Sequence, residues 1–252
     1  MTPLRLQIDR WAAWAPGLES QEAWETWLAE GDAVPPEPAA AVPPLAEMPA
    51  MMRRRIEPLG RIALQAAYWA QGGQAPAGPV VFASRWGEIA RSVEMLQQLA
   101  AGEPLSPTAF SLSVHNAIGA LFSIARGDRN TYQAISAGAY SVEAGFAEAS
   151  GLIADGAASV LLVCFEAPLP PLYRAHGDAY DGFMLPRAFA LKLSCTAADC
   201  GISLASRAGE APPSTAGLPS DLCALRFLVG ADPQQRSLDA GRWRWQRDDD
   251  QA

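Results

Sequence analysis

The sequence is poor in the residues from which proteins build metal and redox sites. Its 252 residues include four cysteines and two histidines. A structural zinc site needs a cluster of cysteine and histidine ligands. Cys195 and Cys200 lie close together, but no second pair of such ligands is present to complete a set of four. We therefore expect no metal site, and no motif in the chain calls for a cofactor.

So few cysteines in a chain of this length favour a reduced, cytoplasmic protein over a disulfide-stapled one. The N-terminus carries acidic and basic residues early and has no continuous apolar segment, so we expect no signal peptide. Nor does any uninterrupted apolar run reach the about 18 residues that a membrane-spanning helix needs. The sequence predicts a cytoplasmic chain without a membrane span.

Excess positive charge and several signature motifs are also missing. The net charge of −8 argues against nucleic acid as a partner. The sequence contains no G-x-S-x-G, no G-x-x-x-x-G-K-[ST] and no G-x-G-x-x-G that opens a helix. These absences remove the characteristic signals of α/β-hydrolases, P-loop nucleotide hydrolases and dinucleotide-binding enzymes.

The remaining reactive side chains fit structural roles better than catalytic ones. Cys164 lies within an apolar run, where burial keeps a thiol protonated and inert. His115 stands at the start of a predicted helix, where a structural hydrogen bond is the expected role. Glu143 and Glu148 have no second acid with which to form a general acid and base pair.

Half of the residues are hydrophobic, and their spacing alternates between strand and helix periods. Strands are predicted at 4–10, 80–83, 131–135, 159–165, 189–193 and 243–245. Helices are predicted at 21–29, 58–71, 87–101, 114–125, 141–154 and 221–228. This alternation is typical of an α/β protein with a mostly parallel sheet and helices on both faces.

Other features of the chain are local. In the helix predicted over 87–101, the apolar residues Ile89, Val93, Leu96 and Leu99 are expected to face inward. The proline-rich segment 33–50 reads as an extended loop, and the Gly-, Pro- and Ser-rich segment 196–219 has no regular pattern.

Five stretches carry a resemblance to a known family. They are 52–55 (MRRR), 111–116 (SLSVHN), 121–127 (LFSIARG), 141–145 (SVEAG) and 166–170 (EAPLP). From about Met1 to Trp245 the chain resembles the amino-terminal half of β-ketoacyl synthases. More narrowly, it is similar to the chain length factors that accompany the ketosynthases of aryl polyene pathways. The resemblance implies a thiolase-like half fold in one domain, residues 1–245, followed by a flexible acidic tail, 246–252.

The resemblance also implies that the chemistry of the family is missing. Condensing enzymes carry a nucleophilic cysteine at the turn between a strand and a helix. By position that turn is Gly138-Ala139 here, and neither residue can form a thioester. The catalytic histidines of the family belong to a carboxy-terminal half, before which this sequence stops. We therefore expect no condensing activity from the chain alone.

Two segments are expected to meet a partner subunit. In the family, the strand before the nucleophile turn pairs across the dimer axis; here it comprises Thr131, Tyr132, Gln133, Ala134 and Ile135. The segment after a Ser-Pro pair lines the acyl tunnel of the partner; here it comprises Thr108, Ala109 and Phe110.

The resemblance thus implies a non-catalytic subunit that forms a heterodimer with an active ketosynthase, completes the dimer and shapes the partner's tunnel. Acyl carrier proteins are strongly acidic, so a chain of net charge −8 is expected to contact them only indirectly. Two alternatives remain open. One is a free-standing acyl hydrolase or acyltransferase that uses Ser136 or Ser141; the other is a homodimeric acyl-binding scaffold.

Overall fold

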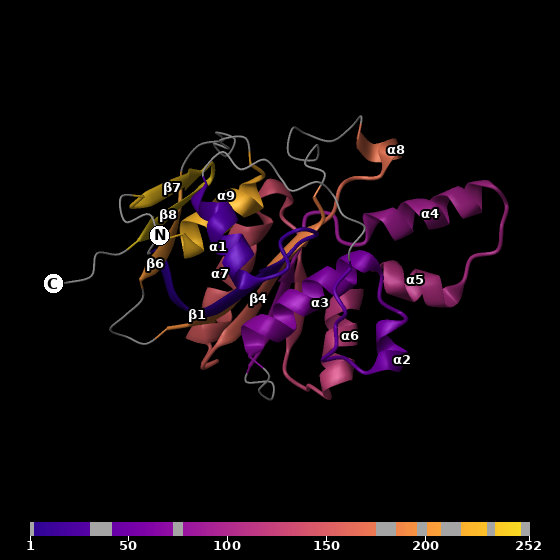
Figure 1. Cartoon of the computed structure of the whole chain (residues 1–252), viewed down its shortest axis with the longest axis horizontal. Helices are drawn as coiled ribbons and strands as arrows, with labels where there is room; N and C mark the ends of the chain where they lie inside the picture. The colour runs from indigo at the N-terminus through magenta and orange to yellow at the C-terminus, as the bar shows by residue number, and fades with distance from the viewer. Residues whose placement is uncertain are drawn as a thin grey trace.

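An eight-stranded sheet in the order β3-β2-β4-β5-β1-β6-β8-β7 forms the centre of the molecule, and helices cover both of its faces (Figure 1). The computed structural model describes residues 3–30, 42–72, 78–174, 185–195, 201–207, 218–230 and 235–247. The α/β class expected from the alternating pattern is confirmed.

The strands and helices have the following bounds. The strands are β1 (Leu4–Trp14), β2 (Val80–Ala83), β3 (Tyr132–Ile135), β4 (Val160–Glu166), β5 (Arg187–Ser194), β6 (Ile202–Ser206), β7 (Ser237–Ala240) and β8 (Trp243–Arg247). The helices are α1 (Gln21–Ala29), α2 (Ala50–Arg53), α3 (Pro58–Gln71), α4 (Ile89–Ala100), α5 (Pro107–Ser113), α6 (Ala117–Arg126), the 3-10 turn η1 (Gly138–Tyr140), α7 (Ser141–Ala154), α8 (Pro171–Arg174) and α9 (Ser220–Val229).

Two hydrophobic cores lie on opposite faces of the sheet because successive side chains of a strand point to opposite sides. Val81 and Ala83 of β2 belong to the core that includes residues of α1, α7 and α9. Val80 and Phe82 belong to the core built with α3 and α6. Both faces of β2 are therefore buried, which explains its continuous apolar sequence.

Helix ends follow the local chemistry of the sequence. The Ser20 side chain caps α1 by accepting a hydrogen bond from the Ala23 N–H at 3.2 Å. Pro58 occupies the first turn of α3. The same helix ends at Gly72, whose φ of 75° lies in the left-handed region that favours glycine. The predicted bounds of α1 and α3 are confirmed.

The sheet is mixed, and the expectation of a mostly parallel sheet is wrong. β2 pairs in parallel with β3 and β4, while the other pairings, from β4 through β7, are antiparallel. Parallel neighbours need a long crossover, usually through helices. The chain supplies such a crossover between β2 and β3 and between β3 and β4. The apolar period of a strand carries no information on its direction, so the sequence pattern left this point undetermined.

Several short elements are absent from the predicted pattern. The segment expected to be irregular contains β6, and β7, α2, α5 and α8 were not predicted either. Each has four to seven residues, too few for apolar spacing to distinguish a helix from a strand. β8 includes Gln246 and Arg247, which the sequence had assigned to the tail. Residues 248–252, and 33–41 of the proline-rich loop, lie outside the described residues.

Two further expectations are corrected. Leu96 and Leu99 of α4 are 56% and 59% exposed, although their spacing predicted an inward stripe. The helix leaves the body of the molecule after Val93 and Met95, its only buried residues. Cys195 is disulfide-bonded, so the prediction of reduced cysteines fails at this position. Cys164 and Cys223 keep free thiols.

The described residues offer neither a single membrane-spanning helix nor a metal site. Within them no single helix is long and apolar enough to span a membrane, and α5 with α6 meet the length and composition test only as a pair bent by 97°. In the same ranges no group of three or more His, Cys, Asp or Glu residues is arranged to hold a metal ion.

Two glycines of α7 provide a test of how closely this helix packs on the sheet. A Cβ at Gly145 would lie 2.6 Å from Leu162 Cδ1 and 3.1 Å from Ala83 Cβ, whereas a Cβ at Gly151 would meet nothing within 4 Å. Gly145→Ala should lower the free energy of unfolding by about 1–3 kcal/mol through overpacking. Gly151→Ala should raise it by up to about 1 kcal/mol through helix propensity. Urea unfolding measures both, and equal effects would contradict this packing.

Candidate functional site

The turn that joins β3 to α7 is the candidate site. It runs from Ser136 through η1 to Ser141. Gly138 has a φ of 61°, so the turn needs glycine for its backbone conformation although a side chain would have space there. At the expected nucleophile position, Gly138 and Ala139 present no side-chain heteroatom.

The two serines of the turn use their hydroxyl groups in backbone contacts. Ser141 Oγ accepts from the Ala137 N–H at 3.1 Å and donates to the Gly138 carbonyl at 2.8 Å. Ser136 Oγ donates to the Arg85 carbonyl at 2.9 Å. Both protons are therefore directed to carbonyl oxygens and not to a base. These bonds shape the turn and do not activate a nucleophile.

His115 also has a structural role. Its Nε2 lies 2.9 Å from the Ser84 carbonyl oxygen, at the junction of α5 and α6. This confirms the hydrogen-bonded structural role that its position at a helix start predicted. His176 lies outside the described residues.

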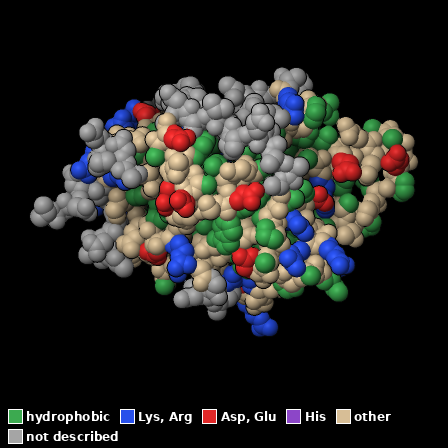
Figure 2. Space-filling model, viewed as in Figure 1, with side chains coloured by type: hydrophobic (Ala, Val, Ile, Leu, Met, Phe, Trp, Pro, Cys, Tyr) green, Lys and Arg blue, Asp and Glu red, His purple; other side chains and the backbone are tan. Residues whose placement is uncertain are grey.

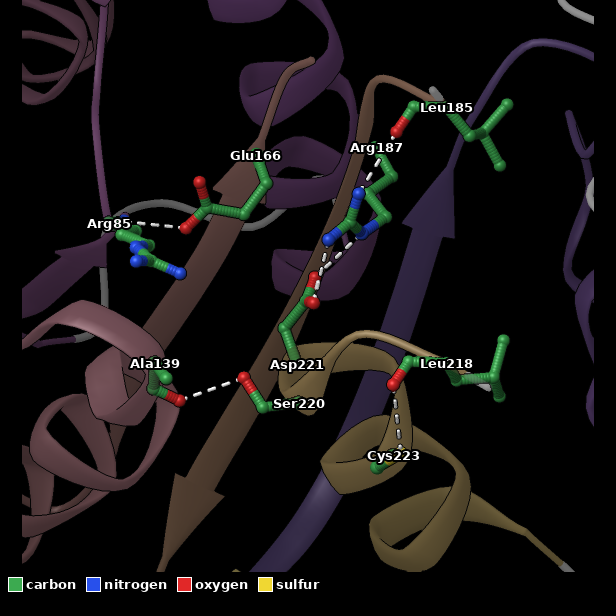
Figure 3. A network of polar contacts seen from close by, with 9 residues as sticks. All are labelled: Arg85, Ala139, Glu166, Leu185, Arg187, Leu218, Ser220, Asp221 and Cys223. Atoms are coloured by element: carbon green, nitrogen blue, oxygen red, sulfur yellow. Dashed lines mark hydrogen bonds and ion pairs between the residues drawn. The ribbon is translucent and has the colours of Figure 1, made fainter. Parts of the chain in front are cut away.

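A small pocket opens beside the turn. Its walls come from the turn, from the ends of β2 and β4, and from the segment that begins α9. Figure 3 shows how Ser220 and Asp221 approach the turn and β5 from α9. Ser220 Oγ donates to the Ala139 carbonyl at 2.8 Å, which joins α9 directly to the position expected for the nucleophile.

A buried ion pair forms the floor of this pocket. Arg187 Nε and Nη2 each donate to one carboxylate oxygen of Asp221 at 2.7 Å, and Arg187 Nη1 donates to the Leu185 carbonyl at 3.1 Å (Figure 3). The two-point contact is the strong geometry for a guanidinium and a carboxylate. Removing one partner of such a buried pair typically costs about 3–5 kcal/mol, so this contact fixes α9 against β5.

Two carboxyl groups feel the negative charge of Asp221; Glu143 is buried and Glu166 is half-buried. Glu166 accepts from the Arg85 backbone N–H at 2.5 Å, and burial followed by the negative charge of Asp221 raises its pKa to about 8. Glu143, at the start of α7, accepts from the Trp245 indole N–H at 3.0 Å, and burial raises its pKa to about 7. Both groups therefore carry a proton over much of the neutral range.

Cys164 also lines the pocket, but its thiol is not reactive. Burial, reinforced by the charges of Asp221, Glu166 and Glu143, raises the pKa of its thiol well above the usual value. A thiol reacts as its thiolate, so this group does not replace a nucleophile at the turn.

The structure places the residues predicted to meet a partner on the outside of the fold. Residues 132–135 form β3, which lies at one edge of the sheet. Thr131 precedes the strand, and its carbonyl accepts from the Val80 N–H at 3.0 Å. Thr108 and Phe110 lie exposed on α5, where Phe110 is 62% exposed, and Ala109 is half-buried.

Sequence reasoning missed the polar network of Glu166, Arg187, Asp221 and the Glu143–Trp245 pair. One signal was available, because Arg187 opens an apolar strand and a buried arginine requires an acidic partner. Asp221 begins the helix predicted over 221–228, and nothing in the sequence identified its partner. The partner of Arg187 lies 34 positions away in the sequence, so spacing alone could not identify it.

Residues 24–246 match the family model of the β-ketoacyl synthase N-terminal domain. The chain belongs to the β-ketoacyl synthase family. The resemblance on which the fold class was predicted is therefore confirmed, together with the thiolase-like fold of this family. No curated protein matches the sequence.

Solved ketosynthase structures show the same fold. A chain in the complex of the ketosynthase ApeO with its chain length factor ApeC, from Xenorhabdus doucetiae, has a TM-score of 0.83 at 29% identity. That match covers 97% of this chain and 100% of the other.

Two further matches have lower identity. The ishigamide ketosynthase/chain length factor has a TM-score of 0.62 at 17% identity, covering 92% of this chain and 84% of that one. A β-ketoacyl synthase from Burkholderia phymatum STM815 has a TM-score of 0.62 at 16% identity, covering 83% and 66%. At these identities the likeness concerns the fold alone.

The buried carboxyls of this β-ketoacyl synthase family member predict a pH dependence of stability. In the unfolded chain Glu143 and Glu166 titrate at their ordinary value of 4.5, well below the folded values of about 7 and about 8. Their protonation therefore stabilises the fold fully below about pH 4.5, and this contribution is lost as the pH rises to about 8. Each pKa unit corresponds to about 1.4 kcal/mol.

Glu166→Gln keeps the acceptor for the Arg85 N–H and removes one of the two titrations. Urea unfolding between about pH 5 and about pH 9 should show stability falling more steeply with pH in the wild type than in Glu166→Gln. Parallel curves for the two proteins would contradict the raised pKa of Glu166.

Proposed function

We propose that this chain is a non-catalytic subunit, similar to a chain length factor, that pairs with an active ketosynthase of the aryl polyene type. The partner carries out the condensation, and this chain completes the dimer and shapes the acyl tunnel. The observation that carries the proposal is the combination at β3 of an edge strand with a turn that has no nucleophile. The full-length likeness to a chain of a ketosynthase and chain length factor complex supports it.

The hydrogen-bonding groups of β3 support pairing with another strand. Val80 N–H donates to Thr131 O, and Ser84 N–H donates to Ile135 O. Because the backbone groups of successive residues in a parallel ladder point to opposite sides, those of Tyr132 and Ala134 face away from β2. Such an edge binds a strand from a second subunit through main-chain hydrogen bonds.

Exposed apolar side chains on α5 and α6 also support a partner-binding surface next to β3. α6 contacts β3 and α5, and Ile124 of α6 is 67% exposed. Val114, between α5 and α6, and Phe110 are exposed as well. Large exposed apolar groups that cluster on one side mark contact surfaces in soluble proteins. We propose that they lie against the ketosynthase partner, with Thr108, Ala109 and Phe110 at its tunnel.

The chemistry of the turn supports a non-catalytic role. A condensing reaction requires a nucleophile, a group that activates it and donors for the developing oxyanion, acting together. Gly138 and Ala139 supply no nucleophile, and Ser136 and Ser141 donate to carbonyl oxygens. Contact with an acyl carrier protein is then made chiefly by the partner, consistent with the net charge of −8.

Ala134→Pro tests the pairing of β3. Proline removes the N–H that faces away from β2 and leaves the hydrogen bonds of Thr131 and Ile135 to β2 in place. The variant should fold but bind the ketosynthase at least about tenfold more weakly, because it loses one hydrogen bond and crowds the edge. Biolayer interferometry with the purified ketosynthase measures the affinity, and circular dichroism checks the fold.

Ala134→Ser is the matched control, since it keeps the N–H and almost the same volume. It should bind as the wild type does. A folded Ala134→Pro variant with unchanged affinity would show that β3 is not the paired strand.

Phe110→Ala tests tunnel shaping. If the ring closes the end of the partner's tunnel, its removal should shift the products of the reconstituted complex to greater length by one or more malonyl-derived units. A well-packed wall rejects extra carbons because overpacking costs about 1–3 kcal/mol. Mass spectrometry of the products measures the shift. Leu172→Ala, which removes another exposed apolar side chain, serves as the control, and the same product distribution in both variants would contradict the role of Phe110.

The hydrolase or acyltransferase alternative uses Ser136 or Ser141 without a partner. Incubation of the purified chain with acyl-thioesters distinguishes it, because our proposal predicts no turnover without the ketosynthase. The homodimeric scaffold alternative is distinguished by co-expression with the ketosynthase and size exclusion. Our proposal predicts a 1:1 complex, and a self-dimer in the presence of the ketosynthase would contradict it.

A further inference from the structure

Helices α4 and α5 project together from one end of the molecule (Figure 1). We call α4, α5 and the residues between them the arm. α4 contacts α5, yet no residue of α5 is buried and only Val93 and Met95 of α4 are. Figure 2 shows hydrophobic side chains at the surface of this end of the molecule. Core packing therefore holds the arm weakly, and its direction depends on the contacts at the base of α4 and on the contact of α5 with α6.

A buried carboxyl group stands at that base. Glu88 directly precedes α4 and is only 8% exposed. Its carboxyl group lies against Gly60, with Oε1 3.5 Å from the position that a Cβ at residue 60 would take, and the Gly60 backbone N–H acts on it as a donor that lowers its pKa against the larger, raising effect of burial. Gly60 lies in the first turn of α3, where N–H groups have no partner within their own helix. The contact thus joins the start of α4 to the first turn of a helix that is almost entirely buried.

Glycine at position 60 permits this close approach. A Cβ there would lie 2.7 Å from Ile56 Cγ2 and 3.5 Å from Glu88 Oε1. An alanine there would have to displace Ile56, which packs beside Glu88, while Glu88 Oε1 would stay at ordinary contact distance. The short distance between α3 and the start of α4 is therefore a requirement of the packing.

The loop between β2 and α4 is fixed from a second side. Ser84 Oγ accepts from the Gly87 N–H at 2.8 Å, and the Ser84 carbonyl lies 2.9 Å from His115 Nε2. A Cβ at Gly87 would lie 2.9 Å from the His115 ring. Arg91, one turn into α4, forms an ion pair with Glu57 at the start of α3. After Arg91, no side-chain hydrogen bond or ion pair ties α4 to the body within the part of the chain that the structure describes.

We propose that Glu88 is a positioning residue that sets the direction of the arm and thereby the place of Phe110 in the acyl tunnel of the partner. This inference rests on the proposed function. α4 has 12 residues and is about 18 Å long, so a tilt of about 10° at its base moves its end by about 3 Å. A displacement of that size exceeds the length of a methylene group and changes the depth of the tunnel.

A series of substitutions distinguishes the role of the Glu88 side chain as a hydrogen-bond acceptor from the role of its charge. Burial raises the pKa of Glu88 to about 7, so the neutral amide of Glu88→Gln is a close substitute that still accepts from Gly60 N–H. Glu88→Asp is too short to reach, and Glu88→Ala has no acceptor. Gly60→Ala displaces Ile56 beside the same contact and keeps the carboxyl group. Glu94→Ala, on the exposed face of α4, is the matched control.

The readout is the product distribution of the complex reconstituted with the purified ketosynthase. Glu88→Asp, Glu88→Ala and Gly60→Ala should each change the ratio of the two main product lengths by about threefold or more. Glu88→Gln and Glu94→Ala should leave the ratio as in the wild type. A purely structural role would lower thermal stability without moving this ratio, and that result would overturn the inference.

Hydrogen exchange of the full chain gives a second test that does not require catalysis. Amides 108–113 of α5 should exchange at least about fivefold faster in Glu88→Asp than in Glu88→Gln, while those of the buried strand β4 keep their protection. Equal exchange of α5 in the two variants would overturn the inference. Failure of the wild-type chain to form a complex would instead contradict the proposed function, so the two failures are distinguishable.

Discussion

The edge of the sheet at β3 is the constraint around which the rest of this protein is organised. Backbone N–H and C=O groups must be hydrogen-bonded, and those on the outer side of an edge strand have only water or a partner. Within the described ranges β3 is the last strand on its side, paired only with β2. The turn that follows β3 leads directly into α7, so the proposed pairing edge and the candidate site are consecutive in the chain. A partner bound at this edge would stand beside the turn.

The polar network at the turn joins the C-terminal part of the chain to the centre of the fold. Arg187 and Asp221 hold α9 on β5, Ser220 holds α9 on the turn, and Trp245 binds Glu143 at the start of α7. Each contact joins the C-terminal part of the chain to the region where a condensing enzyme places its nucleophile. These internal contacts hold the turn in place, which is consistent with the non-catalytic role that we propose.

The sequence predicted the strongly periodic elements and the family, and it failed where information is non-local. The apolar run of β4 and the Pro58-to-Gly72 helix carry their structure in local spacing. The direction of β5 does not, because it depends on which connection the chain makes. Leu96 and Leu99 are a second case in which local spacing did not predict the structure. Their period marks an apolar face, but what covers a face is decided by other elements or by a partner.

The candidate site could be predicted only in part for the same reason. Gly138 and Ala139 were located from the order of strand, turn and helix, and the structure places them at such a turn. The network of Glu166, Arg187 and Asp221 joins residues that are far apart in the chain, so no spacing rule reveals it. Glu88 and Gly60 form a comparable long-range pair, since a glutamate before a helix gives no indication of which backbone group it binds.

The most direct test of the central claim is native mass spectrometry of this chain and its ketosynthase after incubation with an acylated carrier protein. The account predicts a complex with one copy of each subunit, in which peptide mapping finds the acyl group on the ketosynthase alone. An acyl adduct on this chain, or a preparation in which the two proteins remain separate, would contradict it.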